Sequence, residues 1–439
     1  MKKKFWNKKI AAVLAGAMVI TSLTACGGGT DKESAKGSEG GATTLSMTWW
    51  GNQVRNERTQ AALDKYHELN PDVTVEGQFF TWDDYWSKLA TSAAGKKMQD
   101  LVQMDISYLD QYVAKKQLLD LTPYIESGAL NTENISENVL EMGVVGEGNY
   151  GIASGVNAPV IFYNKTLLED NGLEFKDNST LDEFIELARQ VYEKTGYRTS
   201  LGGNANYMEY WSRGQGLPLV DKKIDGTAED YVDYFKVKEQ GMEEGWFIPQ
   251  ELNATSGGAV EEDPLVYGSS PETMVWCNLA GGSNMLTAYQ NAAPEGVEIG
   301  ITTIPTNDPK KSNFLKPSMF FSISADTKNP DAAVAVLDYL INSKEANEIL
   351  LGERGIPAST KVAEEINPLI SETEQAITKF VNEVVAVNCS PINPPAPEGN
   401  SEVADVLKKL EEKIGYGECT AEEAAKEYFE KGNEIYSSK

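Results

Sequence analysis

The sequence is poor in the residue types that metal binding and catalysis use most often. It contains one histidine, His67, and four cysteines. A lone histidine has no partners for a catalytic triad or a zinc site. The three cysteines after Cys26 lack Cys-x-x-Cys spacing, which indicates neither a zinc site nor a disulfide framework, although a single Cys389–Cys419 bridge stays open. We therefore expect no metal, no cofactor and a surface position for His67.

Positive charge is also scarce. The chain has 39 Lys and Arg against 66 Asp and Glu, a formal net charge of −27. Nucleic acid and anionic lipid surfaces attract basic patches, so both are poor partners for so acidic a protein. The acidity is explained by solubility alone. A phosphate loop of the GxxxxGK type is absent, which indicates that the chain is not itself an ATPase.

The apolar run near the N-terminus is short. Five lysines precede the run Ile10–Ile20, which is the layout of an export signal. About 20 apolar residues are needed to cross a bilayer, so this run predicts export without a permanent anchor. The following Leu23-Thr24-Ala25-Cys26 and three glycines resemble the lipobox of bacterial lipoproteins, in which the cysteine is diacylated; a plain signal peptide is the alternative. We expect a signal peptide over 1–25, lipidation of Cys26 and a flexible tether over 26–42, which together place the protein on the outer face of the cell membrane.

The remainder of the chain is too long for one ordinary core and alternates strand-like with helix-like segments. Strands are predicted at Leu45–Trp49, Val73–Phe79 and Leu101–Met104, with helices between them and after them. This alternation predicts an α/β fold with two lobes. Ligands of open α/β sheets bind beyond the carboxyl ends of the strands, so the turns after these three strands are candidate site segments.

Several segments resemble the extracellular solute-binding proteins of carbohydrate ABC importers, the family of the maltose-binding and multiple-sugar-binding proteins. They occur in the family's order and cover most of the chain from 43 to 360. The segments are MTWWGNQVRNERT (47–59), DLVQMDISYLDQY (100–112), YGIASGVNAPVIFYNKTLLEDNGL (150–173), PETMVWCNLAGGSNM (271–285), FLKPSMFFSISADTKNPDAAVAVLDYL (314–340) and ERGIPAS (353–359).

The resemblance implies a periplasmic-binding-protein-like fold, in which two α/β lobes are joined by hinge crossings and enclose a ligand cleft. The implied crossings lie near Gly155-Val156-Asn157, Val275-Trp276 and Phe320-Phe321. The N-terminal lobe would comprise 43–155 and 278–319, and the C-terminal lobe 156–277 and 320–439. The implied function is that of a monomeric, non-enzymatic lipoprotein that binds an oligosaccharide and delivers it to the permease subunits of an ABC importer.

A carbohydrate site needs aromatic faces for the C–H patches of the sugar and polar forks for its hydroxyl groups. On the N-terminal lobe the side chains that meet these needs follow the predicted strands. Consecutive strand residues point to opposite faces, so Trp50 is predicted to face the ligand and Trp49 the core. A surface ion pair is the alternative for Arg55, and plain packing for both Trp50 and Trp82. The N-lobe candidates are Trp50, Asn52, Arg55, Trp82 and Asp105.

On the other lobe and the crossings, the candidates are Asn157, Trp211, Trp276, Asn278 and Arg354. Asn157 adjoins a crossing, which lines the cleft by construction. Core filling is the alternative for both tryptophans, since it is the commoner fate of this residue.

Two other functions stay open. A lipid-anchored glycoside hydrolase would need two carboxylates about 5 to 10 Å apart, such as Asp105 with Glu209, but nothing in their spacing identifies such a pair. A binder of a non-sugar solute, such as a peptide, is the other alternative.

Overall fold

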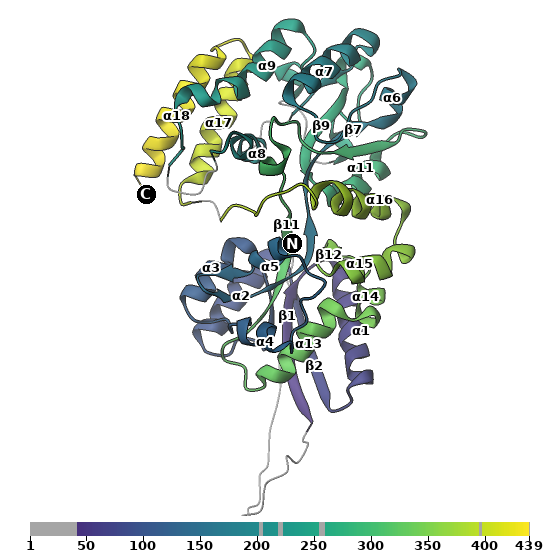
Figure 1. Ribbon diagram of the computed structural model, residues 1–439, viewed down its shortest axis with the longest axis vertical. Coiled ribbons are helices and arrows are strands. Elements are labelled where there is room, and N and C mark those ends of the chain that lie inside the picture. Colours follow the sequence, from purple (N-terminus) through teal and green to yellow (C-terminus); the bar gives the residue numbers. More distant parts are fainter. Residues whose placement is uncertain (1–41, 202–204, 218–222, 254–259, 395–396, 439) are drawn as a thin grey trace, which may run out of the picture. The chain divides into compact units, whose positions relative to one another are not determined.

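The computed structural model describes residues 42–201, 205–217, 223–253, 260–394 and 397–438. The predicted signal peptide, Cys26 and the tether up to residue 41 lie outside these residues. The described part forms one compact unit that contains a six-stranded and a four-stranded sheet, and each sheet with its helices forms one α/β lobe (Figure 1). The predicted two-lobed α/β fold is confirmed. No helix within the described ranges is long and apolar enough to cross a membrane.

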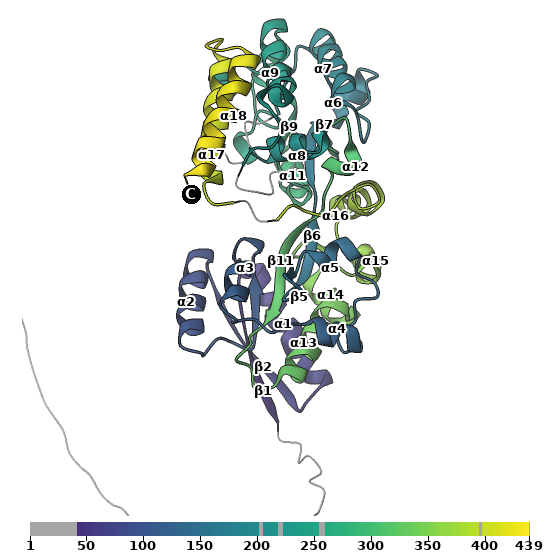
Figure 2. The same cartoon turned by 60° about the vertical axis from the view of Figure 1, so that its left-hand side comes forward.

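The first lobe is built on the six-stranded sheet, with strand order β12-β6-β11-β3-β1-β2. Strands β1, β2 and β3 are parallel, whereas β11 pairs antiparallel with both β3 and β6. Helices α1, α13 and α14 pack together beside β1, as both views show (Figures 1 and 2). The elements are β1 (Thr43–Trp50), α1 (Gln53–Leu69), β2 (Val73–Phe80), α2 (Trp82–Ala94), β3 (Leu101–Met104), α3 (Ile106–Ala114), α4 (Thr122–Ser127), α5 (Glu137–Glu141), β4 (Val144–Val145), β5 (Gly148–Asn149), β6 (Ile152–Asn157), β11 (Lys316–Ile323), α13 (Pro330–Asn342), α14 (Lys344–Leu350), β12 (Ile356–Pro357) and α15 (Thr360–Ile366).

The second lobe is built on the four-stranded sheet, with strand order β10-β7-β9-β8. Helices α9, α17 and α18 pack against one another (Figure 2). The elements are β7 (Pro159–Asn164), α6 (Lys165–Asp170), α7 (Leu181–Thr195), β8 (Arg198–Thr199), α8 (Ala205–Gln215), α9 (Val232–Glu244), α10 (Gln250–Asn253), β9 (Val275–Gly282), α11 (Leu286–Ala292), β10 (Ile299–Thr302), α12 (Pro309–Ser312), α16 (Glu372–Phe380), which runs into a π-helical turn over Val381–Val385, α17 (Asn400–Gly415) and α18 (Ala421–Ser437).

Local sequence signals explain why these elements begin where they do. The side chain of Asn52 caps α1 by accepting a hydrogen bond from the Arg55 backbone N–H. Thr180 and Glu183 form a capping box at the start of α7, in which each side chain satisfies a backbone N–H that the helix leaves free. Strand β3 is buried along its whole length, as expected for a central parallel strand.

The strand pairing differs from the predicted division into lobes. Strand β10 and most of β9 lie in 278–319, which was assigned to the N-terminal lobe, but both strands belong to the four-stranded sheet. Strand β11 and the helices α13 and α14 lie mostly beyond residue 320, yet they pack in the first lobe. The chain does cross between sheets at Asn157–Pro159, as predicted. The predicted crossing at Val275-Trp276 is wrong, because these residues begin β9 in the four-stranded sheet. The chain returns to the six-stranded sheet over 303–315, just before the predicted Phe320-Phe321, which lie within β11.

His67 lies at the surface, as predicted, and the three described cysteines are unpaired. Cys277 is buried, Cys389 and Cys419 are partly buried, and all three are free, so the bridge left open by the sequence is not formed. His67 is exposed, and its Nδ1 lies 2.8 Å from the Val73 carbonyl oxygen.

Candidate functional site

A cavity of about 460 Å³ lies where the chain crosses between the two sheets. Most of its wall comes from the second lobe. The first lobe contributes the start of α3, the end of β6 and the start of β11. Its size is within the range of 300 to 1,000 Å³ typical of small-molecule sites. The lining residues include Ile106, Ser107, Asn157, Pro159, Met208, Glu209, Leu279, Gly282, Phe314, Lys316, Asn393, Asn400, Val403, Leu407 and Tyr428.

Glu209 on α8 is the one carboxylate among the described residues of this lining. The side-chain N–H of Asn393 donates to its Oε1 at 3.0 Å. Burial raises the pKa of Glu209, while the charges of Arg213 and Lys316 and the Asn393 hydrogen bond oppose that rise. Arg213 is itself held by Asn393 Oδ1 and by the Pro391 carbonyl oxygen, so it steadies the 390–393 segment that carries Asn393. A carboxylate oriented in this way can accept hydrogen bonds from ligand hydroxyl groups.

Asn157 supplies a second polar group at the crossing. Its Nδ2 donates to Ser318 Oγ at 3.1 Å. Its Oδ1 is buried and has no hydrogen-bond partner among the described residues. Lys316 lies opposite Asn157 in the β11–β6 register and is exposed. Asn157 and the Lys316 cation are both part of the cavity lining at the crossing, which is consistent with the prediction for Asn157.

An aromatic cluster, made of Trp50, Trp82, Tyr85, Trp86 and Tyr108, stands at the carboxyl ends of the first-lobe strands. The rings of Trp50 and Trp82 meet edge to face with centroids 5.0 Å apart, and those of Trp86 and Tyr108 stack at 3.8 Å. Trp82 is 42% exposed, whereas Trp50 is 8% exposed. Tyr108 follows the lining residues Ile106 and Ser107 on α3, but no residue of the cluster is itself among the described lining residues of the cavity. Of the predicted aromatic contacts on this lobe, Trp82 presents the larger free face and Trp50 supports it from behind.

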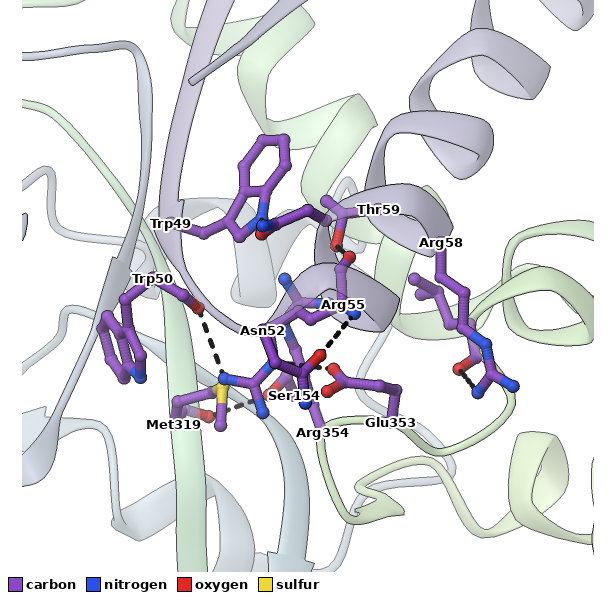
Figure 3. A network of polar contacts seen from close by, with 12 residues as sticks. Trp49, Trp50, Asn52, Arg55, Arg58, Thr59, Ser154, Met319, Glu353 and Arg354 are labelled. Carbon is purple, nitrogen blue, oxygen red and sulfur yellow. Dashed lines mark hydrogen bonds and ion pairs between the residues drawn. The ribbon is translucent and has the colours of Figure 1, made fainter. Parts of the chain in front are cut away.

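Asp105 and the polar residues after β1 are engaged within the protein. Asp105 Oδ1 accepts from the Ser107 backbone N–H at 2.9 Å, which makes it the N-cap of α3. Asp105 itself is not in the cavity lining, although the next two residues are. Arg55 Nε pairs with Glu353 Oε2 at 2.6 Å (Figure 3). The ion pair weighed as the alternative for Arg55 is thus observed, and Asn52 acts as the cap of α1.

The structure does not bring the three second-lobe candidates to the cavity. Trp211 is 3% exposed and packs against Tyr234, although it shares α8 with Glu209. Trp276 is fully buried and donates from Nε1 to Thr199 Oγ1 at 2.8 Å. Asn278 donates to Asp263 Oδ2 at 2.6 Å. Core filling, the alternative for both tryptophans, describes their surroundings because each indole is enclosed by aromatic neighbours.

Most of the cavity's polar lining was not predicted from the sequence, namely Ser107, Lys316, Asn393 and Asn400, and Glu209 was named only as a possible hydrolase carboxylate. The sequence does contain a signal for Asn393. It lies in a proline-rich segment that must be extended, so the backbone groups of this segment cannot pair with one another in a helix. Within the described ranges, no group of three His, Cys, Asp or Glu side chains is placed to hold a metal ion.

The known proteins that are similar to this chain include solute-binding proteins of bacteria. The family model described as bacterial extracellular solute-binding protein matches residues 50–347. The galactooligosaccharide-binding protein of Bacillus subtilis is 23% identical over 85% of this chain and 86% of its own length. The diacetylchitobiose binding protein DasA of Streptomyces coelicolor is 25% identical over 81% and 84%.

Solved structures agree on the fold. An extracellular solute-binding protein of family 1 from Alicyclobacillus acidocaldarius has a TM-score of 0.80 at 25% identity, covering 90% of this chain and 99% of that one. A periplasmic oligogalacturonide binding protein from Yersinia enterocolitica has a TM-score of 0.73 at 22% identity, with the same coverage. The similarity to the second structure supports the fold alone.

Proposed function

Because the chain belongs to the bacterial extracellular solute-binding proteins, we propose that it binds an oligosaccharide in the cavity at the sheet crossings and delivers it to an ABC importer. The observation that carries the proposal is the lining of the cavity, which combines Glu209, Asn157, Asn393 and Lys316 with apolar side chains. Hydroxyl groups need such fixed acceptors and donors, and sugar faces need apolar or aromatic contacts. The relatives named for galactooligosaccharide and diacetylchitobiose support a carbohydrate as the solute class.

In this proposal Glu209 accepts hydrogen bonds from ligand hydroxyl groups, and Asn393 and Lys316 donate to ligand oxygens. Trp82 provides an exposed ring face on the first lobe, with Trp50 fixing its orientation. Asn52, Arg55, Asp105 and Arg354 act on the ligand only through the segments they hold in place. Trp211, Trp276 and Asn278 stabilise the second lobe.

The protein is proposed to bind its sugar without cleaving it. Hydrolysis of a glycosidic bond uses two carboxylates across the bond. Glu209 is the single acidic residue in the described lining, and the nearby Arg213 cation is committed to protein oxygens. An oligosaccharide incubated with the protein should be recovered intact, as judged by chromatography, and turnover of many equivalents would contradict this assignment.

The ligand proposal is tested by thermal shift over a panel of oligosaccharides and peptides, followed by calorimetry. A ligand at 100 times its dissociation constant stabilises the native state by about 2.7 kcal/mol. Glu209→Gln should weaken binding of the selected sugar about tenfold or more, since a hydrogen bond to a charged group contributes about 1.5 to 3 kcal/mol. Glu193→Gln, an exposed change on α7, is the matched control. A panel in which only peptides stabilise the protein would assign the non-sugar alternative.

Lipid attachment through Cys26, after removal of 1–25, is proposed as the means that keeps the binder beside its importer. Two acyl chains suffice for stable attachment. Cys26→Ala should abolish incorporation of labelled fatty acid, and continued acylation of that variant would refute the assignment. The binding unit is proposed to act as a monomer.

A further inference from the structure

The Arg354 guanidinium is buried without enough hydrogen-bond partners. Arg354 lies on the short loop between α14 and β12 and is 5% exposed. Its Nε donates to Gln103 Oε1 at 2.9 Å, and its Cζ lies 5.2 Å from the ring centroid of Phe321. Both terminal nitrogens, Nη1 and Nη2, are buried and have no partner among the described residues. A buried charged group in this condition carries a large desolvation cost unless something pairs with it.

The charges around Arg354 do not balance. Glu353 is already paired with Arg55 at 2.6 Å, so the group of Arg55, Glu353 and Arg354 keeps one surplus positive charge (Figure 3). Burial, followed by the charge of Arg55, lowers the pKa of Arg354 to about 9. The guanidinium is therefore still protonated at neutral pH.

A small cavity of about 20 Å³ adjoins this side chain. Phe321, Asn347, Gly355 and Glu353 are among its other lining residues, and the Glu353 carboxylate is neutralised by its pair with Arg55. A volume of this kind accepts a single particle about the size of a water molecule, because one water needs at least 10 to 15 Å³. Sulfate and phosphate are too large for it. Gly352 and Gly355 have φ values of 65° and 94°, which a side chain would strain, so the glycines hold the loop in the shape that bounds the cavity.

We propose that Arg354 binds a small monovalent anion of the halide class in this cavity. The anion would accept hydrogen bonds from Nη1 and Nη2 and neutralise the surplus charge. Together with the hydrogen bond from Arg354 Nε to Gln103, the anion would link β3 to the loop that leads into β12. Gln103 Nε2 also donates to the Trp50 carbonyl oxygen at 3.1 Å, so these hydrogen bonds connect the loop to the aromatic cluster as well. This site is separate from the oligosaccharide cavity and does not depend on the proposed function.

The test measures thermal unfolding of the mature protein at constant ionic strength while chloride replaces methanesulfonate, an anion too large for the cavity. The melting temperature of the unchanged protein should rise in proportion to the logarithm of chloride concentration above the dissociation constant. Arg354→Gln should remove this dependence. Arg189→Gln, which removes a partly exposed arginine paired with Glu244 in the second lobe, should keep it.

A second measurement needs no variant and decides the matter if Arg354→Gln does not fold. Crystals of the unchanged protein grown in bromide should show an anomalous scattering peak within hydrogen-bonding distance of Nη1 or Nη2. A melting temperature that is independent of chloride, an equal dependence in Arg354→Gln, or a position that holds only water would each overturn the proposal.

Discussion

At the scale of single residues, the tryptophans show that a position at the end of a strand does not by itself determine whether a side chain is exposed to a ligand or buried in the core. Trp49 and Trp50 are adjacent, and both are buried, one beneath α1 and the other within the aromatic cluster. Alternation places their rings on opposite faces of the sheet, as predicted, but helices cover both faces. Trp82 remains exposed because it begins a helix at the edge of the sheet.

Trp82 and Trp276 should therefore respond to truncation in opposite ways. Trp82→Ala is expected to lower sugar affinity about fivefold, from an aromatic contact of about 1 kcal/mol, with little loss of stability. Trp276→Ala should lower the free energy of unfolding by about 3 to 5 kcal/mol, because it empties a packed core and leaves Thr199 without its donor. Calorimetry and urea unfolding separate the two effects. Equal loss of stability in both variants would contradict the assignment of Trp82 to the ligand surface.

At the scale of elements, local sequence patterns predicted most helices and strands but not which strands pair with one another. The bounds of β3 match the expected range, and a Thr-x-x-Glu capping box starts α7 at Thr180. These features depend on neighbours in the sequence. The place of β11 between β3 and β6 depends on pairing across more than 150 residues, which no local pattern encodes. The cavity lining was missed for the same reason, since Glu209, Lys316 and Asn393 meet only after folding.

Helix α17 combines a cavity face with a buried carboxyl group. Leu407 lines the cavity, and Glu411, one turn later, is 6% exposed. Tyr234 on α9 donates a hydrogen bond from its hydroxyl group to Glu411. The positive charge of Lys238 acts to lower the pKa of this carboxyl group. Burial raises the pKa of Glu411 to about 7, against the opposing effects of Lys238 and Tyr234; the neighbouring Glu412 adds to the rise.

This raised pKa predicts the pH dependence of stability. The native state binds the Glu411 proton more tightly than the unfolded chain, so the contribution is complete below about pH 4.5 and is lost as pH rises through about 7. Glu411→Gln should remove this slope and stabilise the protein at pH 7.5 by on the order of 3 kcal/mol. Urea unfolding at pH 5 and 7.5 measures both, and Glu412→Gln is the control. An unchanged slope in Glu411→Gln would contradict the prediction.

At the scale of the whole molecule, the site depends on both lobes. Ile106 and Ser107 come from the first lobe, and Glu209 and Leu407 from the second. A ligand favours one arrangement of the lobes only through contacts that it gains in that arrangement. The proposed ligand touches both sets of residues, so it should limit the motion of one lobe against the other.

Small-angle scattering should then show a smaller radius of gyration at saturating sugar. A shift from 1:99 to 99:1 between two lobe arrangements requires about 5.5 kcal/mol of differential affinity. Glu209→Gln should weaken this compaction in proportion to its lost affinity, while Glu193→Gln should preserve it. A radius of gyration that does not change at saturation would show that the ligand contacts only one lobe.

The strand order of the first lobe also sets the order in which its strands can pair during synthesis. Strands β6 and β3 are not neighbours, and β11, which lies between them, is made only after the entire four-stranded sheet. A chain synthesised from its N-terminus thus keeps β1, β2 and β3 with an open edge until residues 316–323 appear. Closing so long a loop is slow, because its entropy is lost before the distant contacts form. The late arrival of β11 therefore delays completion of the native six-stranded sheet.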